Sequence, residues 1–189
     1  MRKLRDATAR HLEGHRFYCF SDVDVPCERI ALEHDWPGWW AKIELFRAIK
    51  RPTLYLDLDT LVTGPLQPLA RLTHDFAMID LRHANQEGIG QSGVMWITKP
   101  MPEIYDKFTS RPEAWMRIYT EQAKQTYCGD QAFIHDAIGI PPKITRDLPG
   151  FVRSYKLQCV NGPLNSSLVC FHGKPGPHET TGWTQKAWI

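Results

Sequence analysis

The amino-acid sequence predicts an α/β fold in which a mostly parallel central sheet carries helices on both faces. Short, unbroken apolar runs such as Thr53–Leu56 and Phe76–Ile79 are typical of strands buried on both faces. These runs alternate with segments whose apolar residues recur at helical spacing, which is the order of βαβ units. The 189 residues suit a single domain, 1–189, and the tail from about residue 173 is expected to be irregular because it is rich in Pro, Gly and polar residues.

Turn and breaker residues set the expected boundaries of the elements in the first half of the chain. Gly14 closes the first helix, Ser21-Asp22 ends the first strand, and Pro37-Gly38 opens the second helix. The elements expected there are a helix at Arg5–Leu12, a strand at Phe17–Phe20, a helix from Trp39 to about Ile49 and a strand at Thr53–Leu56.

In the second half, the loop at Gly64-Pro65 precedes further apolar runs, and Gly139 stops the last long helical segment. The elements expected there are strands at Phe76–Ile79 and Gly93–Ile97, two helices between Pro102 and Ala123, a helix from Asp130 to Gly139 and a last strand at Leu168–Phe171.

Composition excludes several classes of function. The net charge is only +2 and the basic residues are scattered, whereas a nucleic-acid-binding protein shows a basic stripe. No segment approaches the roughly 18 apolar residues of a transmembrane helix, and the first residues lack the apolar run of a signal peptide. The five cysteines form an odd set without C-x-x-C spacing, which argues against a disulfide framework and a zinc knuckle. We therefore expect a cytoplasmic protein with neither a nucleic-acid partner nor a transmembrane segment.

The strongest functional signal is a pair of carboxylates that directly follows the buried strand Thr53–Leu56. Because side chains alternate along a strand, Asp57 and Asp59 are expected to point the same way while Leu58 points into the core. A cation between two such anions stabilises them, and hard carboxylate oxygens select Mg²⁺ or Mn²⁺. In open α/β sheets, ligands bind at the carboxyl ends of strands. The pair therefore predicts a divalent-metal site, with a solvated acidic turn as the simpler alternative.

Two enzyme classes place such a pair after a buried strand: nucleotide-sugar transferases and phosphatases of the haloacid dehalogenase type. In a phosphatase, Asp57 would be the nucleophile. Phosphatases of that type have Thr or Val four residues later, where this chain has Leu61, and Gly129-Asp130 lacks their second acid at the usual spacing. The phosphatase remains the alternative to a transferase.

Two polar residues in helical segments suggest contacts in the same site. Lys42 falls in an apolar stripe between Phe46 and Ile49, and a buried lysine needs an anion such as Asp57 or a donor phosphate. We expect Lys42→Met to keep the fold and to weaken donor binding; an alternative is that Lys42 reaches solvent. Asp130 either caps its helix or lies beside the donor sugar or the acceptor hydroxyl, with Gln131 supporting the reacting centre.

Five segments, taken in order, resemble GT-A glycosyltransferases, specifically the glycosyltransferase family 8-like group of bacteria and their phages. The resemblance covers about residues 15 to 180. The matching segments are Trp39–Phe46 before the metal motif, the D-x-D strand Tyr55–Asp59, Ser92–Met95 for the N-x-G-V strand, Gly129–Gln131 for the D-Q helix start, and Cys170–Pro175 for the terminal H-x-x-G-x-x-K-P motif.

The resemblance implies a metal-dependent glycosyltransferase of hexosyltransferase type, with a nucleotide-sugar donor and a carbohydrate or other hydroxyl acceptor. It implies His172 as the third metal ligand, and an imidazole ligand favours Mn²⁺ because Mg²⁺ prefers oxygen shells. The implied roles are metal binding by Asp57, Asp59 and His172, donor binding by Lys42, Asp57, Ser92, Gly93 and Lys174, and catalysis by Asp130 and Gln131.

The chain departs from the family pattern at three places. Gln91 stands where the family has Asn, and the terminal motif that contains Lys174 is shorter. The family begins with a strand that cradles the nucleotide base, whereas this sequence starts at the helix after it. We therefore expect the first nucleotide-binding strand to be absent, either because the start is truncated or because the base is held differently. A catalytically inactive sugar-binding module of the same fold is a third alternative, although the intact Asp57, Asp59 and His172 argue against it.

Overall fold

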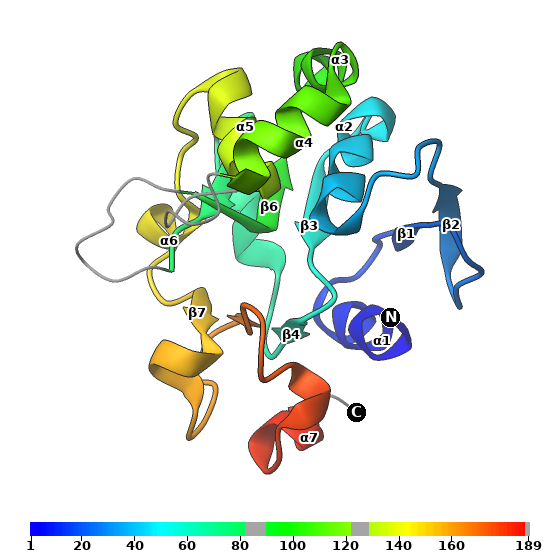
Figure 1. The fold of residues 1–189 in the computed structure, drawn as a ribbon. Helices are drawn as coiled ribbons and strands as arrows, with labels where there is room; N and C mark the ends of the chain where they lie inside the picture. The colour runs from blue at the N-terminus through cyan, green and yellow to red at the C-terminus, as the bar shows by residue number, and fades with distance from the viewer. Residues whose placement is uncertain (82–89, 122–128, 188–189) are drawn as a thin grey trace.

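A computed structural model describes residues 1–81, 90–121 and 129–187 (Figure 1). The helices are α1 (Arg2–His11), α2 (Leu45–Ala48), α3 (Pro102–Thr109), α4 (Pro112–Glu121), α5 (Gly129–Ile138), α6 (Ile144–Asp147) and α7 (Trp183–Ala187), with 3₁₀-helices at Gly38–Glu44, Gln67–Arg71 and Pro177–Glu179 and a π-helix at Tyr155–Cys159. The strands are β1 (Tyr18–Ser21), β2 (Glu28–Ala31), β3 (Thr53–Leu56), β4 (Thr60–Val62), β5 (Phe76–Ile79), β6 (Gln91–Ile97), β7 (Val152–Ser154) and β8 (Leu168–Cys170). The expected helical positions 122 and 123 lie outside the described residues.

The central sheet has the strand order β3-β6-β5, and both of its ladders are antiparallel. The prediction of a mostly parallel central sheet is therefore wrong for the described strands. Parallel pairing occurs between β1 and β2 and between β7 and β8. Strand β5 is buried along its whole length and β3 is half-buried, and apolar runs of this kind do not depend on strand direction.

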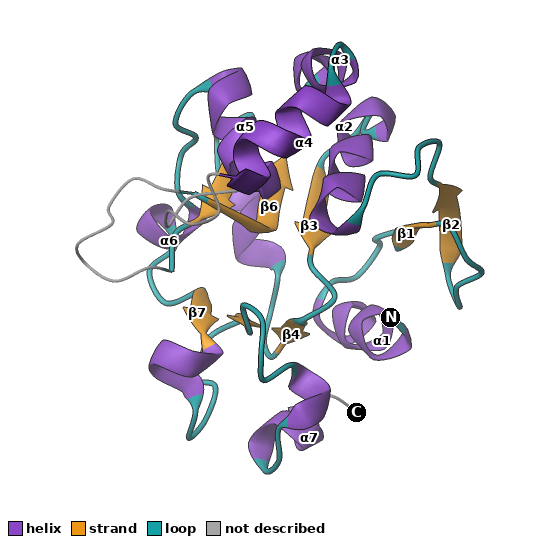
Figure 2. Ribbon diagram, in the orientation of Figure 1, coloured by secondary structure: helices purple, strands orange, loops and turns teal. Residues whose placement is uncertain are grey.

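The two faces of the central sheet belong to different hydrophobic clusters. Tyr55, Met78 and Met95 point into the cluster formed with the Gly38–Glu44 helix, α2, α3 and α5. Alternate residues such as Leu56 and Val94 point the other way, as the pleat requires. The layers are visible in Figure 2, with the helices above the central sheet and the second sheet below it.

The second face of the central sheet packs on α1, on α6 and on a small sheet with the order β4-β8-β7. The prediction of helices on both faces is therefore only partly correct, because a second sheet contributes much of the cover.

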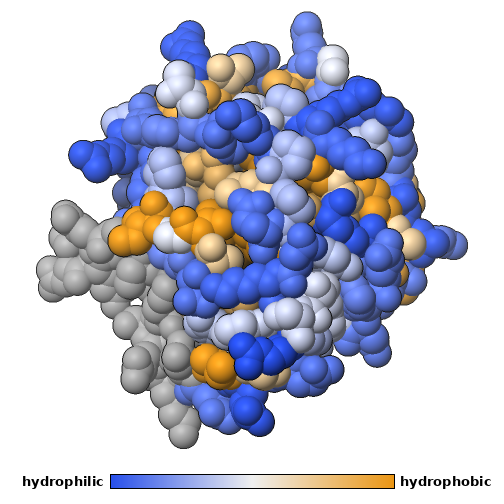
Figure 3. All heavy atoms as spheres, turned by 90° about the horizontal axis from the view of Figure 1, so that it is seen from above, coloured by the Kyte–Doolittle hydropathy of each residue, from blue (hydrophilic) through white to orange (hydrophobic). Residues whose placement is uncertain are grey.

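From above, the surface is largely hydrophilic, with apolar side chains gathered in small patches (Figure 3). Within the described ranges, none of the helices has the length and apolar character needed to cross a membrane.

The chain passes from the central sheet to the small sheet through a tight turn after β3. The Thr60 amide donates to the Asp57 carbonyl at 3.0 Å, and β4 then pairs antiparallel with β8, with Thr60 opposite Cys170. Leu58 is 57% exposed in this turn, so its predicted core position is wrong. The strand alternation used in that prediction ends at Leu56.

The segment expected as one helix from Trp39 to about Ile49 has two parts. Residues Gly38–Glu44 form a 3₁₀-helix, and only Leu45–Ala48 are α-helical. A 3₁₀-helix has three residues per turn, so side chains three apart share a face. Trp40 and Ile43 point into the core in this way, while Trp39 and Lys42 share a different face.

Candidate active site

A cavity of about 220 Å³ opens where the end of β3, the start of β4, the end of β8 and the start of α5 meet. Nearly all of the residues predicted to form the site contribute to its walls. The lining residues are Trp39, Lys42, Asp57, Asp59, Thr60, Gln91, Ser92, Gly93, Asp130, Gln131, Cys170, His172 and Gly173.

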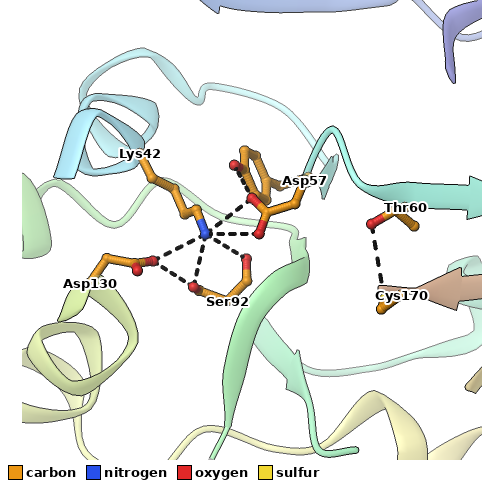
Figure 4. A network of polar contacts seen from close by, with 7 residues as sticks. Lys42, Asp57, Thr60, Ser92, Asp130 and Cys170 are labelled. Atoms are coloured by element: carbon orange, nitrogen blue, oxygen red, sulfur yellow. Dashed lines mark hydrogen bonds and ion pairs between the residues drawn. The ribbon is translucent and has the colours of Figure 1, made fainter. Parts of the chain in front are cut away.

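The amino group of Lys42 lies between two carboxylates on one wall of the cavity (Figure 4). Its Nζ is 3.1 Å from Oδ1 of Asp57 and 3.2 Å from Oδ2 of Asp130. It also donates to the Ser92 hydroxyl at 2.9 Å, and that hydroxyl in turn donates to Asp130 at 2.5 Å. The network joins the 3₁₀-helix, β3, β6 and α5 at a single cation.

Burial makes this network electrostatically strong. The side chains of Lys42 and Asp130 are only 8% and 7% exposed, whereas that of Asp57 is 34% exposed. Burial opposes the charge on Lys42, but the negative charges of Asp130 and Asp57 outweigh it and raise the pKa of Lys42. The lysine therefore remains charged, and its partners are the protein's own carboxylates.

Tyr55 holds Asp57 through Oδ1, the same carboxylate oxygen that lies nearest Lys42. Its hydroxyl donates to Oδ1 of Asp57 at 2.6 Å, and burial together with the Asp57 charge raises the Tyr55 pKa well above its usual value. Tyr55 therefore stays a neutral donor. The Asp57 backbone amide donates to the Gly93 carbonyl at 2.8 Å, and a Cβ at Gly93 would lie 3.4 Å from Oδ2 of Asp57.

Asp59 and His172 reach the cavity from the small sheet. Antiparallel pairing of β4 with β8 places the residue before Thr60 close to the residues after Cys170. Burial, and then the charge of Asp57, raise the pKa of Asp59, while a hydrogen bond from the Gly173 backbone opposes this shift. The charged form of Asp59 is therefore less stable than that of an exposed carboxylate, and a nearby cation would stabilise it.

The chemistry of these ligands fits a hard divalent cation, but their geometry is incomplete. Two carboxylates and an imidazole line one cavity, and the raised pKa of Asp59 reflects an unfavourable charge that a cation would relieve. In residues 1–81, 90–121 and 129–187, however, no three His, Cys, Asp or Glu side chains are arranged to hold a metal. The Asp57 carboxylate is directed at Lys42 and Tyr55 instead.

The cavity also contains residues that the sequence did not single out for this site. Trp39, Thr60 and Cys170 line it, and Tyr55 holds Asp57. A signal was available for Tyr55, since it stands two residues before Asp57 and hence on the same side of the strand. Lys174, in contrast, is exposed and does not line the cavity, so its donor-binding role stays a prediction.

The fold that carries this cavity resembles the fold of a solved glycosyltransferase. The structure resembles the glycosyltransferase GlyE of Streptococcus pneumoniae TIGR4 with a TM-score of 0.61 and 15% sequence identity, over 98% of this chain and 55% of the GlyE chain. The apo form of GlyE gives a TM-score of 0.59 and 15% identity, over 99% of this chain and 55% of that one. A weaker likeness is to the galactosyltransferase LgtC in complex with donor and acceptor sugar analogues, with a TM-score of 0.49 and 19% identity over 78% of this chain and 63% of that one.

The chain spans about half the length of the GlyE structures that it matches. No protein-family profile matches the sequence, and neither does any curated protein. At this identity the likeness shows a shared fold and does not by itself assign an activity to this chain.

Proposed function

We propose that the protein transfers a sugar from a nucleoside-diphosphate sugar to an acceptor hydroxyl, with a divalent metal, Mn²⁺ or Mg²⁺, bound in the cavity. The observation that carries the proposal is the cavity itself. It gathers Asp57, Asp59 and His172 beside the network of Lys42 with Asp130, on a fold shared with a glycosyltransferase. A metal that stabilises the leaving diphosphate and polar groups that orient the sugar are what metal-dependent glycosyl transfer would use in such a cavity.

Asp57, Asp59 and His172 would hold the metal, with oxygens of the donor diphosphate completing the shell. When bound, the metal supplies positive charge that stabilises the departing diphosphate. Lys174, one residue after Gly173, would add a second positive charge to the same group.

The role of Lys42 is to position other groups of the site. It pairs with both Asp57 and Asp130, and so it holds the two carboxylates together on one wall. Asp130 and the neighbouring Gln131 then orient the transferred sugar, while Ser92 and Gly93 line the donor side. The bond from the anomeric carbon to the diphosphate oxygen breaks with its electron pair on the oxygen. A new bond forms from that carbon to the acceptor oxygen, and the hydroxyl proton is released.

A phosphatase would use the same turn differently, because Asp57 would have to attack phosphorus. Here both oxygens of Asp57 lie close to Lys42, and Oδ1 also accepts from Tyr55, which lowers the nucleophilicity of the carboxylate. This arrangement favours a positioning role for Asp57 over a nucleophilic one.

A thermal-shift screen of nucleotide sugars with and without Mn²⁺ tests the proposal. We expect at least one nucleotide sugar to raise the Tm only when Mn²⁺ is present, because ligand binding to the folded state stabilises it. The hit is then assayed for release of nucleoside diphosphate, alongside p-nitrophenyl phosphate as a general phosphatase substrate. Metal-dependent cleavage of the phosphomonoester, without turnover of any nucleotide sugar, would overturn the proposal in favour of the phosphatase.

A further inference from the structure

Trp39 is the aromatic side chain of the cavity, and packing in the described residues does not explain it. It is 49% exposed and belongs to none of the hydrophobic clusters found in the described ranges. Its neighbour Trp40 is 3% exposed and stacks on Phe108 with 5.2 Å between ring centroids. Two adjacent tryptophans therefore have different environments, and only Trp40 is accounted for by the core.

The 3₁₀-helix directs Trp39 into the cavity. Side chains three residues apart share a face of such a helix, so Trp39 lies beside Lys42, whose amino group bonds Asp57 and Asp130. Both side chains line the cavity. The exposed indole therefore adjoins the charged network and is not an isolated apolar group on the outer surface.

One edge of the Trp39 indole rests on the backbone just before Asp130. A Cβ added at Gly129 would come within 2.8 Å of the indole Nε1 and 3.0 Å of Cε2, so this approach requires a glycine. Gly129 also has a φ of +70°, which favours glycine for a second reason. The close contact at one edge holds the ring in place and leaves part of its surface exposed.

We propose that Trp39 is a platform on which a pyranose ring stacks, and that the acceptor is therefore itself a carbohydrate. The inference rests on the proposed function and names its acceptor class. An indole offers a large, rigid apolar face, while Asp130 and Gln131 supply polar groups next to it. Ligand sites commonly combine such an aromatic surface with a few polar groups. The proposed function assigns the donor diphosphate to Asp59 and His172, which leaves the half-exposed indole for the acceptor.

Sugar binding is measured directly, without turnover. Protein labelled with ¹⁵N at the indoles is titrated with methyl pyranosides of gluco, galacto and N-acetylglucosamine configuration, and the Trp39 resonance is assigned from Trp39→Phe. We expect at least one pyranoside to shift this resonance in a saturable way. Trp39→Ala should lose about tenfold in affinity, which corresponds to about 1.4 kcal/mol, while Trp39→Phe retains most of the binding.

Tyr18→Ala is the matched control, because Tyr18 is 42% exposed on β1 and does not line the cavity. It should bind the pyranoside like the wild type. In transfer assays, Trp39→Ala should raise the KM for the sugar acceptor without a matching rise in the KM for the nucleotide sugar.

The outcomes separate this inference from the proposed function. If no pyranoside shifts the Trp39 resonance, or if Trp39→Ala binds as well as the wild type, the platform is refuted even when nucleotide-sugar turnover is intact. Pyranoside binding at Trp39 without any nucleotide-sugar turnover would instead refute the transferase and, with it, the acceptor role.

Discussion

Lys42→Met removes the cation that holds two carboxylates in one buried network. Met fills much of the volume of the lysine stem, so the substitution changes charge and hydrogen bonding more than packing. It leaves Asp130, which is 7% exposed, with the Ser92 hydroxyl as its remaining hydrogen-bond partner in the network. It also removes the nearest positive charge from Asp57.

The distances set the size of the effect. Two unit charges about 3.2 Å apart, as Lys42 and Asp130 are, attract by roughly 5 kcal/mol at an effective dielectric constant of about 20, before the cost of desolvation. Breaking a buried ion pair by removing one partner costs about 3–5 kcal/mol. We therefore expect Lys42→Met to lower the free energy of unfolding by about 3–5 kcal/mol. The expectation from sequence, that Lys42→Met keeps the fold and weakens donor binding, stays a prediction alongside this loss of stability.

Urea unfolding of the metal-free protein measures the change, provided that both variants unfold in a two-state manner. The matched control is Lys107→Met, because Lys107 pairs with Asp136 at 2.8 Å but the two side chains are 33% and 46% exposed. That pair should be worth less than about 1 kcal/mol. Adding Asp130→Asn to Lys42→Met should restore part of the lost free energy of unfolding, because it removes the carboxylate that Lys42→Met leaves without its cation. Equal effects of Lys42→Met and Lys107→Met would refute the account of the network.

Three further predictions concern single side chains. Tyr55→Phe removes the 2.6 Å hydrogen bond to Asp57 and should lower the free energy of unfolding, measured in urea, by about 1.5–3 kcal/mol. An unchanged free energy of unfolding would contradict this prediction. Gly129→Ala should destabilise by about 1–3 kcal/mol and change tryptophan fluorescence, because φ is +70° and the new Cβ meets the indole of Trp39. Lys107 donates a hydrogen bond to Asp136 and lowers its pKa, so the stability from that pair is present above the unfolded pKa of about 3.8 and is lost as pH falls through the folded pKa. Asp136→Asn should accordingly lower the Tm at pH 7 and converge with the wild type in acid; an equal difference at both pH values would contradict this.

Apolar runs located the buried strands well. Strands β3 and β5 occupy the expected residues: the four apolar side chains of β5 are all buried, and the residues of β3 are half-buried. The same runs could not give the direction of pairing, which depends on how distant segments meet. Strand β4 was not predicted, since Thr60–Val62 gains its strand geometry by pairing with β8.

The contacts in the cavity, like the strands, could be predicted only in part from the sequence. The sequence indicated that Lys42 needs an anion, and Asp57 is one of its partners. Asp130 as the second partner could not be predicted, because it depends on the packing of α5 against the 3₁₀-helix. The exposed position of Leu58 was missed for a local reason, since the turn after Asp57 breaks the alternation of the strand.

The most direct test of the central claim measures release of nucleoside diphosphate from the nucleotide sugar found by thermal shift, with Mn²⁺ and with excess chelator. Wild type, Asp59→Asn and Asp75→Asn are compared. Asp75 is 57% exposed, pairs with Lys99 and does not line the cavity, so it controls for the loss of one carboxylate. Because burial and Asp57 raise the pKa of Asp59, the neutral amide should not unfold the metal-free protein, which the Tm verifies. The account predicts turnover that requires Mn²⁺, survives Asp75→Asn and is lost in Asp59→Asn. Full turnover in chelator, or in Asp59→Asn, would contradict it.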